Sequence, residues 1–154
     1  MSVRAYRHFL SALNNQDLDR AAEVVDLARY QENCVGFTPG FVGWEAATAS
    51  LSKVWNGIPD LQVEIVDVFG DESTVLARGT ARGTNTGRLY GVPPTRRSYR
   101  VAFFDSCQFE DGRIVCRVQQ ADVISQMRQL YGRAFGSVGL LSSIVRIDPT
   151  APPL

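Results

Sequence analysis

Histidine is nearly absent from this chain, which argues against several kinds of catalytic centre. His8 is the one histidine among 154 residues, and neither HExxH nor CxxC occurs. A histidine-based metal site and a Ser-His-Asp triad are therefore not expected. The sequence also lacks the glycine fingerprint of nicotinamide- or flavin-binding domains. We expect any chemistry to proceed without a metal or an organic cofactor.

Cysteine and long apolar runs are scarce as well. Cys34, Cys107 and Cys116 are an odd number of cysteines, and the N-terminal MSVRAYRHFLSALNNQD shows no apolar core of a secretory signal. No stretch approaches the roughly 20 apolar residues of a transmembrane helix. We therefore expect free thiols in a cytoplasmic protein that does not contact membranes.

The chain has no surplus of charge of either sign. It carries 16 basic and 16 acidic residues. Nucleic acids and anionic membranes attract a surplus of Lys and Arg, so neither is an expected partner. An apolar content of 45% with 21% charged residues is typical of a soluble globular protein, and the length suits one domain with its own core.

Helical periodicity dominates the first third of the sequence. Apolar residues at helical spacing predict an amphipathic helix over 3–14, and Asp17 is placed to cap a second one. A third helix is predicted at about 44–55, where Asn56-Gly57 ends it. The intervening RYQENCVGFTPGFVG is interpreted as irregular.

Period-two alternation follows. It predicts strands at 61–69, 73–86, 97–109 and 114–121, before a short helix at about 123–131. Helices first and long antiparallel strands second indicate an α+β fold, with a bent antiparallel sheet whose concave side the helices close around an apolar cavity. We expect one domain over residues 1–132. The tail 133–154 either packs on a partner subunit or is disordered.

Asp111-Gly112 marks a type I′ hairpin and sets a register for the last two long strands. If Glu110 faces Arg113, a regular ladder makes the following pairs: Phe109 with Ile114, Cys107 with Cys116, Asp105 with Val118, Phe103 with Gln120, and Val101 with Asp122. Paired side chains share a face of the sheet. The resulting face is mostly apolar, yet it contains two acids and an amide.

The two acids on this face are candidates for acid–base catalysis. Desolvation raises the pKa of a carboxyl group toward neutral pH, where it can exchange protons with a substrate. Asp105 and Asp122 would lie about 13 Å apart along the ladder and flank a substrate of several rings. Each has a structural alternative: Asp122 as the cap of the following helix, and Asp105 as the partner of a backbone amide or an arginine.

The stretch GTNTGRLYGVPPTRRSY at 83–99 resembles the signature of SnoaL-like polyketide cyclases, which commonly read G-T-H-T-G and then G-(I/M/V)-P-P-T before a basic residue and a strand. FEDGRI, RQLYG and IPDLQVEIVDV are also similar to segments of that family. The resemblance covers about residues 5–132. It implies a nuclear transport factor 2-like α+β cone or barrel around an apolar cavity, and a homodimer.

The resemblance also implies roles for individual residues. Asp122 matches the family's general acid/base, with Asp105 as a second catalytic acid at a polar pocket position. Asn85 replaces the usual histidine of G-T-H-T-G, and Arg117-Val118 replaces the usual H-W. The residues expected to contact the substrate are Asn33, Gln120, Phe103, Tyr90, Tyr6 and Trp44. Of these, Gln120 has an alternative as a satisfied polar group, and Tyr6 as a core residue.

The activity implied by the resemblance is a cofactor-free cyclisation of a polyketide-derived substrate in secondary-metabolite (antibiotic) biosynthesis. In an intramolecular aldol condensation, Asp122 would remove an acidic proton and return one to the attacked carbonyl oxygen. Relatives that hydroxylate polyketides, open epoxides or form oxygen heterocycles offer an alternative in the same cavity. A further alternative is a ligand-binding or assembly module without catalysis.

Overall fold

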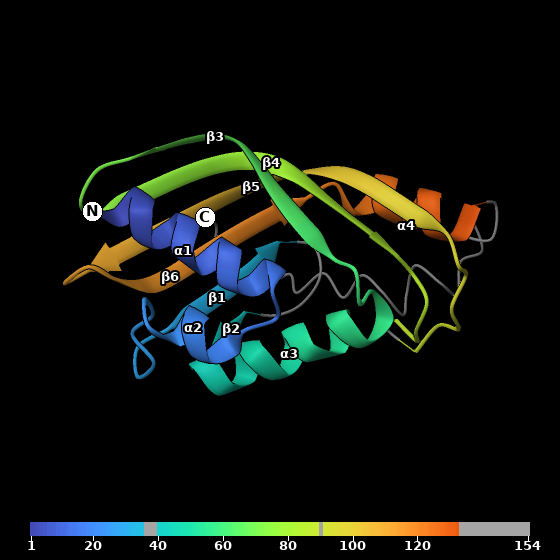
Figure 1. Ribbon diagram of the computed structural model, residues 1–154, viewed down its shortest axis with the longest axis horizontal. Coiled ribbons are helices and arrows are strands. Elements are labelled where there is room, and N and C mark those ends of the chain that lie inside the picture. The colour runs from blue at the N-terminus through green and yellow to red at the C-terminus, as the bar shows by residue number, and fades with distance from the viewer. Residues whose placement is uncertain (36–39, 90, 133–154) are drawn as a thin grey trace.

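The computed structural model describes residues 1–35, 40–89 and 91–132. Its elements, in chain order, are α1 (Ser2–Asn14), α2 (Leu18–Ala22), β1 (Gln31–Val35), β2 (Phe41–Val42), α3 (Trp44–Gly57), β3 (Gln62–Gly70), β4 (Thr74–Thr84), β5 (Ser98–Glu110), β6 (Arg113–Ala121) and α4 (Val123–Tyr131). The strands form one bent sheet in the order β2-β1-β6-β5-β4-β3 (Figure 1). The predicted tail 133–154 and Tyr90 lie outside the described residues.

The α+β prediction is confirmed, with one difference at the edge of the sheet. All four long strands and all four helices fall where the sequence patterns place them. The stretch expected to be irregular instead supplies β1 and β2. Because β1 pairs in parallel with β6, from Gln31 opposite Cys116 to Val35 opposite Gln120, the sheet is mixed and not purely antiparallel. The pairing satisfies backbone groups along an otherwise open edge of β6.

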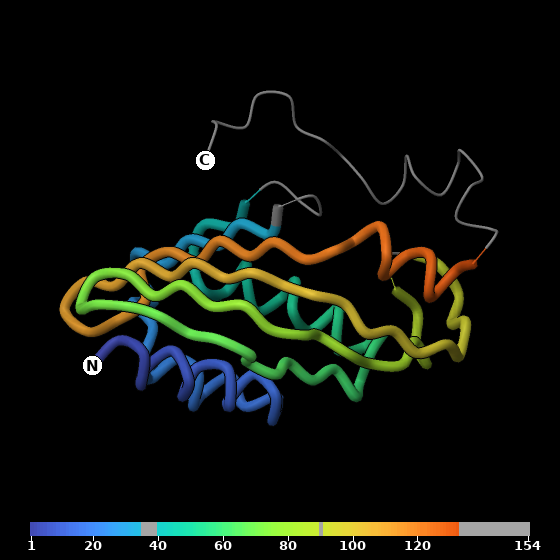
Figure 2. The backbone as a smooth tube through the Cα atoms, turned by 90° about the horizontal axis from the view of Figure 1, so that it is seen from above, coloured from blue at the N-terminus to red at the C-terminus, as the bar shows by residue number. Residues whose placement is uncertain are grey.

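The helices α1 and α3 lie on the concave side of the bent sheet, while α4 lies at the end away from the hairpin tips (Figures 1 and 2). Helix α1 buries Tyr6, Phe9 and Leu10 against the sheet. Its last residue is fixed by two hydrogen bonds, because Asn14 Nδ2 donates to the Val63 oxygen at 2.9 Å and Asn14 Oδ1 accepts from the Val63 amide at 2.8 Å. This contact sets the distance between α1 and β3, and so one wall of the interior.

The hairpin that joins β5 to β6 has the predicted turn. Asp111 and Gly112 both have positive φ, at 49° and 75°, and Glu110 pairs with Arg113. Phe109 also faces Ile114 as expected. The residue that follows Ile114 breaks the regular ladder: Gln108 faces Cys116, so Val115 is an extra residue on β6. Val115 therefore forms a β-bulge.

The bulge makes the rest of the predicted register wrong by one residue. Cys107 faces Arg117, Asp105 faces Gln119, and Phe103 faces Ala121. Because side chains alternate between faces, a shift of one residue moves every later side chain of the strand to the opposite face. Arg117 and Gln119 consequently point to the concave side, and Gln120 points to the outer side.

Apart from Tyr90, the glycine-rich stretch 83–99 joins β4 to β5 at the end of the sheet where α4 lies (Figure 1). The buried Asn85 amide organises it: Nδ2 donates to the oxygens of Gly57 (3.2 Å) and Gly87 (2.8 Å), and Oδ1 accepts from the amide and hydroxyl of Thr95 (2.8 and 3.1 Å). A Cβ at Gly87 would lie 1.8 Å from the Asn56 oxygen, so only glycine fits there. Leu89 packs into a second core cluster with Ile58, Tyr99, Val101, Met127, Leu130 and Tyr131.

None of the helices in the described ranges has both the length and the hydropathy needed to cross a bilayer.

Replacing Asn85 with alanine should destabilise the protein by about 2–4 kcal/mol. The change removes the side-chain partner of two part-buried backbone groups of the loop, the Gly87 oxygen and the Thr95 amide, and each costs about 1–3 kcal/mol. Urea denaturation monitored by circular dichroism measures the loss. Thr86→Ala, at the exposed neighbouring position, should change stability by less than about 0.5 kcal/mol. Equal midpoints for the two variants would contradict the role given to Asn85.

Candidate functional site

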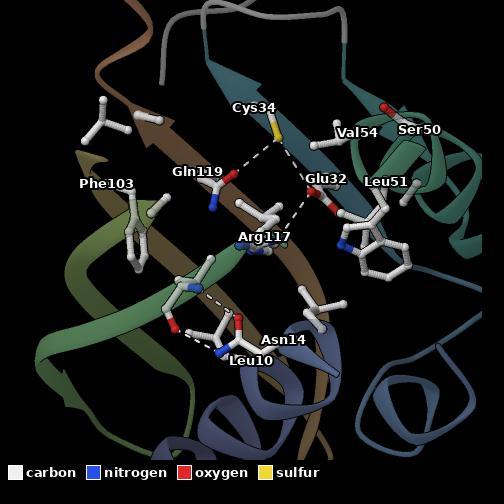
Figure 3. A pocket seen from close by; sticks show the side chains of 18 of the residues that line it. Leu10, Asn14, Glu32, Cys34, Ser50, Leu51, Val54, Phe103, Arg117 and Gln119 are labelled. Carbon is white, nitrogen blue, oxygen red and sulfur yellow. Dashed lines mark hydrogen bonds and ion pairs between the residues drawn. The ribbon is translucent and has the colours of Figure 1, made fainter. Parts of the chain in front are cut away.

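A cavity of about 160 Å³ lies between the concave face of the sheet and the helices α1 and α3. Its wall is mostly apolar and includes Leu10, Phe41, Leu51, Trp55, Val63 and Phe103 (Figure 3). A smaller set of polar side chains interrupts this wall: Asn14, Glu32, Cys34, Ser50, Arg117 and Gln119, with Tyr99 and Gln126 in addition. An apolar cavity with few polar groups is the usual form of a small-molecule site.

A buried arginine between two carboxylates is the main charged feature of the cavity. Arg117 Nη2 donates to Asp105 Oδ2 at 2.9 Å, and Nε donates to both carboxylate oxygens at 3.1 Å. On the other side, Nη1 donates to Glu32 Oε1 at 3.3 Å. The three side chains come from β6, β5 and β1, which the bulge and the parallel pairing bring side by side. The arrangement carries two negative charges and one positive charge.

Charge complementarity compensates the burial of Arg117. Burial disfavours its charged form, but the adjacent Asp105 and Glu32 raise the pKa of Arg117 well above its usual range. Its guanidinium also lies 5.4 Å from the centre of the Phe9 ring. Three of its five N–H groups are used in the contacts above, which leaves two without an acceptor among the described residues.

The two carboxylates differ in how accessible they are to a ligand. Asp105 has a fully buried side chain, and it accepts a hydrogen bond from the Tyr6 hydroxyl at 2.8 Å in addition to those from Arg117. Glu32 accepts from the Tyr30 hydroxyl at 2.7 Å through Oε2, and its side chain is 15% exposed in the wall of the cavity. Glu32 is therefore the carboxylate of this group that a ligand in the cavity can reach.

Cys34 and Gln119 lie beside Glu32. The Cys34 Sγ is 3.5 Å from Glu32 Oε1 and 3.8 Å from Gln119 Oε1, so its proton can bond either oxygen (Figure 3). Burial, and then the charge of Glu32, raise the pKa of the Cys34 thiol to about 12. The thiol is therefore protonated at neutral pH and is a poor nucleophile. Its contact with Gln119 is to the side-chain oxygen, so the Gln119 NH₂ group is left for other acceptors.

A second polar position lies at the end of the cavity next to α4. Tyr99 of β5 and Gln126 of α4 both line it, and both are buried. Burial and the charge of Asp60 raise the pKa of Tyr99 well above its usual range, while a hydrogen bond with the Gln126 side chain acts in the opposite direction. The Tyr99 hydroxyl is therefore un-ionised.

Comparisons with known proteins identify the family. The family model described as SnoaL-like polyketide cyclase matches residues 3–130. The chain belongs to this family. Among curated proteins, no significant match was found.

Solved structures similar to this family member agree with the fold. A putative SnoaL-like polyketide cyclase from Jannaschia sp. CCS1 has a TM-score of 0.77 and 18% identity, with 84% of this chain and 90% of the other covered. IdmH, a putative polyketide cyclase from Streptomyces antibioticus, has a TM-score of 0.74 and 23% identity, with 84% of this chain and 97% of the other covered. An M. tuberculosis LEH-like epoxide hydrolase has a TM-score of 0.67 and 21% identity, with 84% of this chain and 88% of the other covered.

The aspartate that matches the family's general acid/base lies outside the cavity wall. The Asp122 carboxylate is exposed and accepts from the Ser125 amide at 3.0 Å, as the N-cap of α4. Hydrogen bonds from Ser125 lower the pKa of Asp122. The capping alternative is thus confirmed. A lowered pKa makes a weaker base, so this geometry does not favour the catalytic role, which stays a prediction.

The structure brings only part of the predicted set together. Phe103 lines the cavity, whereas Asp105 and Tyr6 lie behind Arg117 as its buried partners. Trp44 packs edge-on against Tyr30, with ring centres 5.4 Å apart, and is outside the cavity lining. Asn33 alternates with Glu32 and Cys34 on β1 and does not line the cavity either.

Gln120 is exposed on the outer face of the sheet, because the bulge turns it away from the interior. Sequence reasoning missed Glu32, Cys34, Arg117 and Gln119 as cavity residues. One signal was available: Ile114-Val115 are two consecutive apolar residues in an otherwise alternating strand, which is what a bulge with both side chains buried looks like. In the described ranges, no three His, Cys, Asp or Glu side chains lie together as metal ligands would.

Asp105→Asn should destabilise the protein by about 3 kcal/mol, because it leaves the buried Arg117 with one carboxylate instead of two. Asp67→Asn is the matched control, since Asp67 pairs with Arg78 across exposed strands. Exposed pairs contribute about 0–1 kcal/mol, so the control should stay within that range. Chemical denaturation of the three proteins at pH 7 measures both values. Similar losses of unfolding free energy in the two variants would show that the buried Asp105–Arg117 pair stabilises the protein no more than an exposed pair does.

Proposed function

We propose that the protein is an enzyme that closes a ring in a neutral, polyketide-derived molecule by acid–base catalysis in this cavity, without a cofactor. The observation that supports it most is the position of Glu32. Its carboxylate stands in an apolar, partly enclosed wall, beside a guanidinium that is held in place by Asp105. Enolate formation requires a base that removes a proton from carbon and a cation that stabilises the negative charge developing on the neighbouring oxygen. A base next to a fixed cation meets both needs.

Each polar side chain takes one role in this proposal. Glu32 accepts the proton from a carbon between two carbonyl groups of the substrate. Arg117 and the Gln119 NH₂ donate to the enolate oxygen. The enolate carbon then attacks a ketone of the same molecule, a C–C bond forms, and Glu32 returns its proton to the new alkoxide. The product is an isomer of the substrate, and the enzyme ends in its starting state.

The apolar walls supply the remaining contribution. A flexible chain that folds against Phe103, Trp55 and Val63 is held with its reacting carbons close together. Because binding already fixes the reactive conformation, the entropy cost of reaching it no longer adds to the reaction barrier. This effect accounts for a large part of many enzymatic accelerations.

Epoxide opening is the second candidate, and one observation favours it. Arg117 lies between two carboxylates. Glu32 is placed to activate a water, while Arg117 donates a hydrogen bond to the epoxide oxygen. The solved M. tuberculosis protein with this fold is described as LEH-like epoxide hydrolase. Hydrolysis adds one water to the substrate.

A hydroxylase, such as the putative one from Streptomyces galilaeus with this fold, adds one oxygen. A binding module returns its ligand unchanged.

The decisive variants are Glu32→Gln and Asp122→Asn. With a panel of β-keto esters that carry an internal ketone, wild type should yield an isomer by mass spectrometry, without added cofactor. Glu32→Gln should lower the rate by about 10²–10⁴-fold, because it removes the base. Asp122→Asn and Asp122→Ser should stay within about threefold of wild type, because both residues still cap α4.

The opposite pattern would assign the base to Asp122 and contradict the proposed site. A product heavier by one water or one oxygen, still lost in Glu32→Gln, would keep the site and replace the reaction. Equal rates in all four proteins would leave no acid–base function for either carboxylate.

We further propose that the protein acts as a cytoplasmic homodimer joined through the outer face of the sheet. Phe69, Leu76 and Phe104 are 70%, 54% and 58% exposed there and line one shallow apolar groove. Isolated apolar residues on a surface are ordinary, but a contiguous apolar patch marks an interaction site. The paired charges around it, Arg78 with Asp67 among them, and a net charge of zero allow two copies to approach without repulsion.

Phe104→Glu should convert the dimer to a monomer in analytical ultracentrifugation, because the introduced charge would have to be buried against its symmetry copy. Ile124→Glu is the control, since Ile124 is 61% exposed on α4, away from that groove. It should leave the sedimentation coefficient unchanged. A wild-type protein that sediments as a monomer at micromolar concentration would contradict the dimer.

A further inference from the structure

The cavity contains polar groups at two separate levels of the sheet. One is the Glu32–Arg117–Gln119 group described above. The other is the pair Tyr99 and Gln126, which are 5% and 8% exposed. The residues packed around this pair are apolar and belong to the second core cluster. A tyrosine and a glutamine at such a position are costly unless their polar atoms have partners.

The strand register separates the two levels. Arg117 stands opposite Cys107, whereas Tyr99 stands opposite Gly83 on the same strand, β5. At about 3.4 Å per residue, these levels are roughly 27 Å apart along the strand, and the long side chains at both levels shorten the gap. The wall between them is apolar and includes Val101, Phe103 and Ala121. A ligand that reaches both levels is elongated.

Tyr99 and Gln126 retain hydrogen-bonding capacity after contacting each other. A glutamine amide has two donors and an acceptor, and a tyrosine hydroxyl has one donor and accepts as well. Even one hydrogen bond between the two side chains would use a minority of these groups. Both side chains line the cavity, so the remaining capacity is available to a ligand there.

We propose that Tyr99 and Gln126 form a distal recognition site for a hydroxyl or carbonyl oxygen at the far end of an elongated, neutral ligand, and that they determine which substrates the cavity accepts. The choice of ligand class rests on the proposed function. The pair lies far from Glu32, so it selects the ligand and does not touch the reacting atoms. Asp122 contributes indirectly: its backbone carbonyl accepts from the Gln126 backbone N–H at 3.0 Å, and its side chain caps α4.

The test compares two ligands that differ by one ring hydroxyl, the anthraquinones emodin and chrysophanol. Isothermal titration calorimetry on wild type should show tighter binding of emodin by about 3–10-fold, the range of one net hydrogen bond. In Gln126→Leu and in Tyr99→Phe, both close in volume to the native residue, the ratio of the two dissociation constants should fall to near one. Arg128→Gln, on the exposed side of α4, should keep the wild-type ratio.

Three results would overturn the distal site: equal affinity of wild type for the two probes, no binding of either, or an unchanged ratio in both Gln126→Leu and Tyr99→Phe. The measurement needs no turnover, so it is independent of the acid–base proposal. Glu32→Gln should retain the preference for emodin even though it lacks activity. A protein without cyclase activity but with the predicted ratios would keep the distal site and reject the proposed reaction.

Discussion

The interior of this protein depends on one buried ion pair, Arg117 with Asp105. An unpaired guanidinium at this depth would be strongly destabilising, so the strands must bring a carboxylate to it. The neighbouring strand β5 supplies Asp105 directly, and β1, the neighbour of β6 on the other side, adds Glu32. The bidentate contact fixes the guanidinium, and Tyr6 completes the coordination of Asp105. With the cation held from behind, the front of the group is free to meet a ligand.

The extra residue Val115 creates this arrangement. Without the bulge, a regular ladder would direct Val118 and Gln120 of β6 inward, and Arg117 would lie on the outer surface opposite Ser106. The bulge reverses the strand after Val115, so Arg117 and Gln119 enter the cavity and Asp122 is left at its edge as a helix cap. A single backbone irregularity thus decides which polar residues of the last strand can take part in chemistry.

The sequence predicted the elements well because their signals are local. The periodicity of α1, the Asp111-Gly112 turn and the cap at Asp17 each need only neighbouring residues, and all three are confirmed. Phe103, predicted to contact the substrate, lines the cavity. The polar group of the site was missed for two reasons: β1 pairs with β6 although the two segments are far apart in the sequence, and the bulge at Val115 shifts the register of β6. The family motif at 83–99 identified the family, yet its Asn85 organises a loop and not the cavity.

The most direct test of this account is a crystal structure of the wild-type protein with emodin bound. We predict that the ligand lies inside the cavity, with an oxygen within hydrogen-bonding distance of Arg117 or Gln119 at one level or of Tyr99 or Gln126 at the other, and that Val115 forms the bulge. A ligand bound against Asp122 outside the cavity, or a strand β6 that directs Gln120 inward, would contradict the site described here.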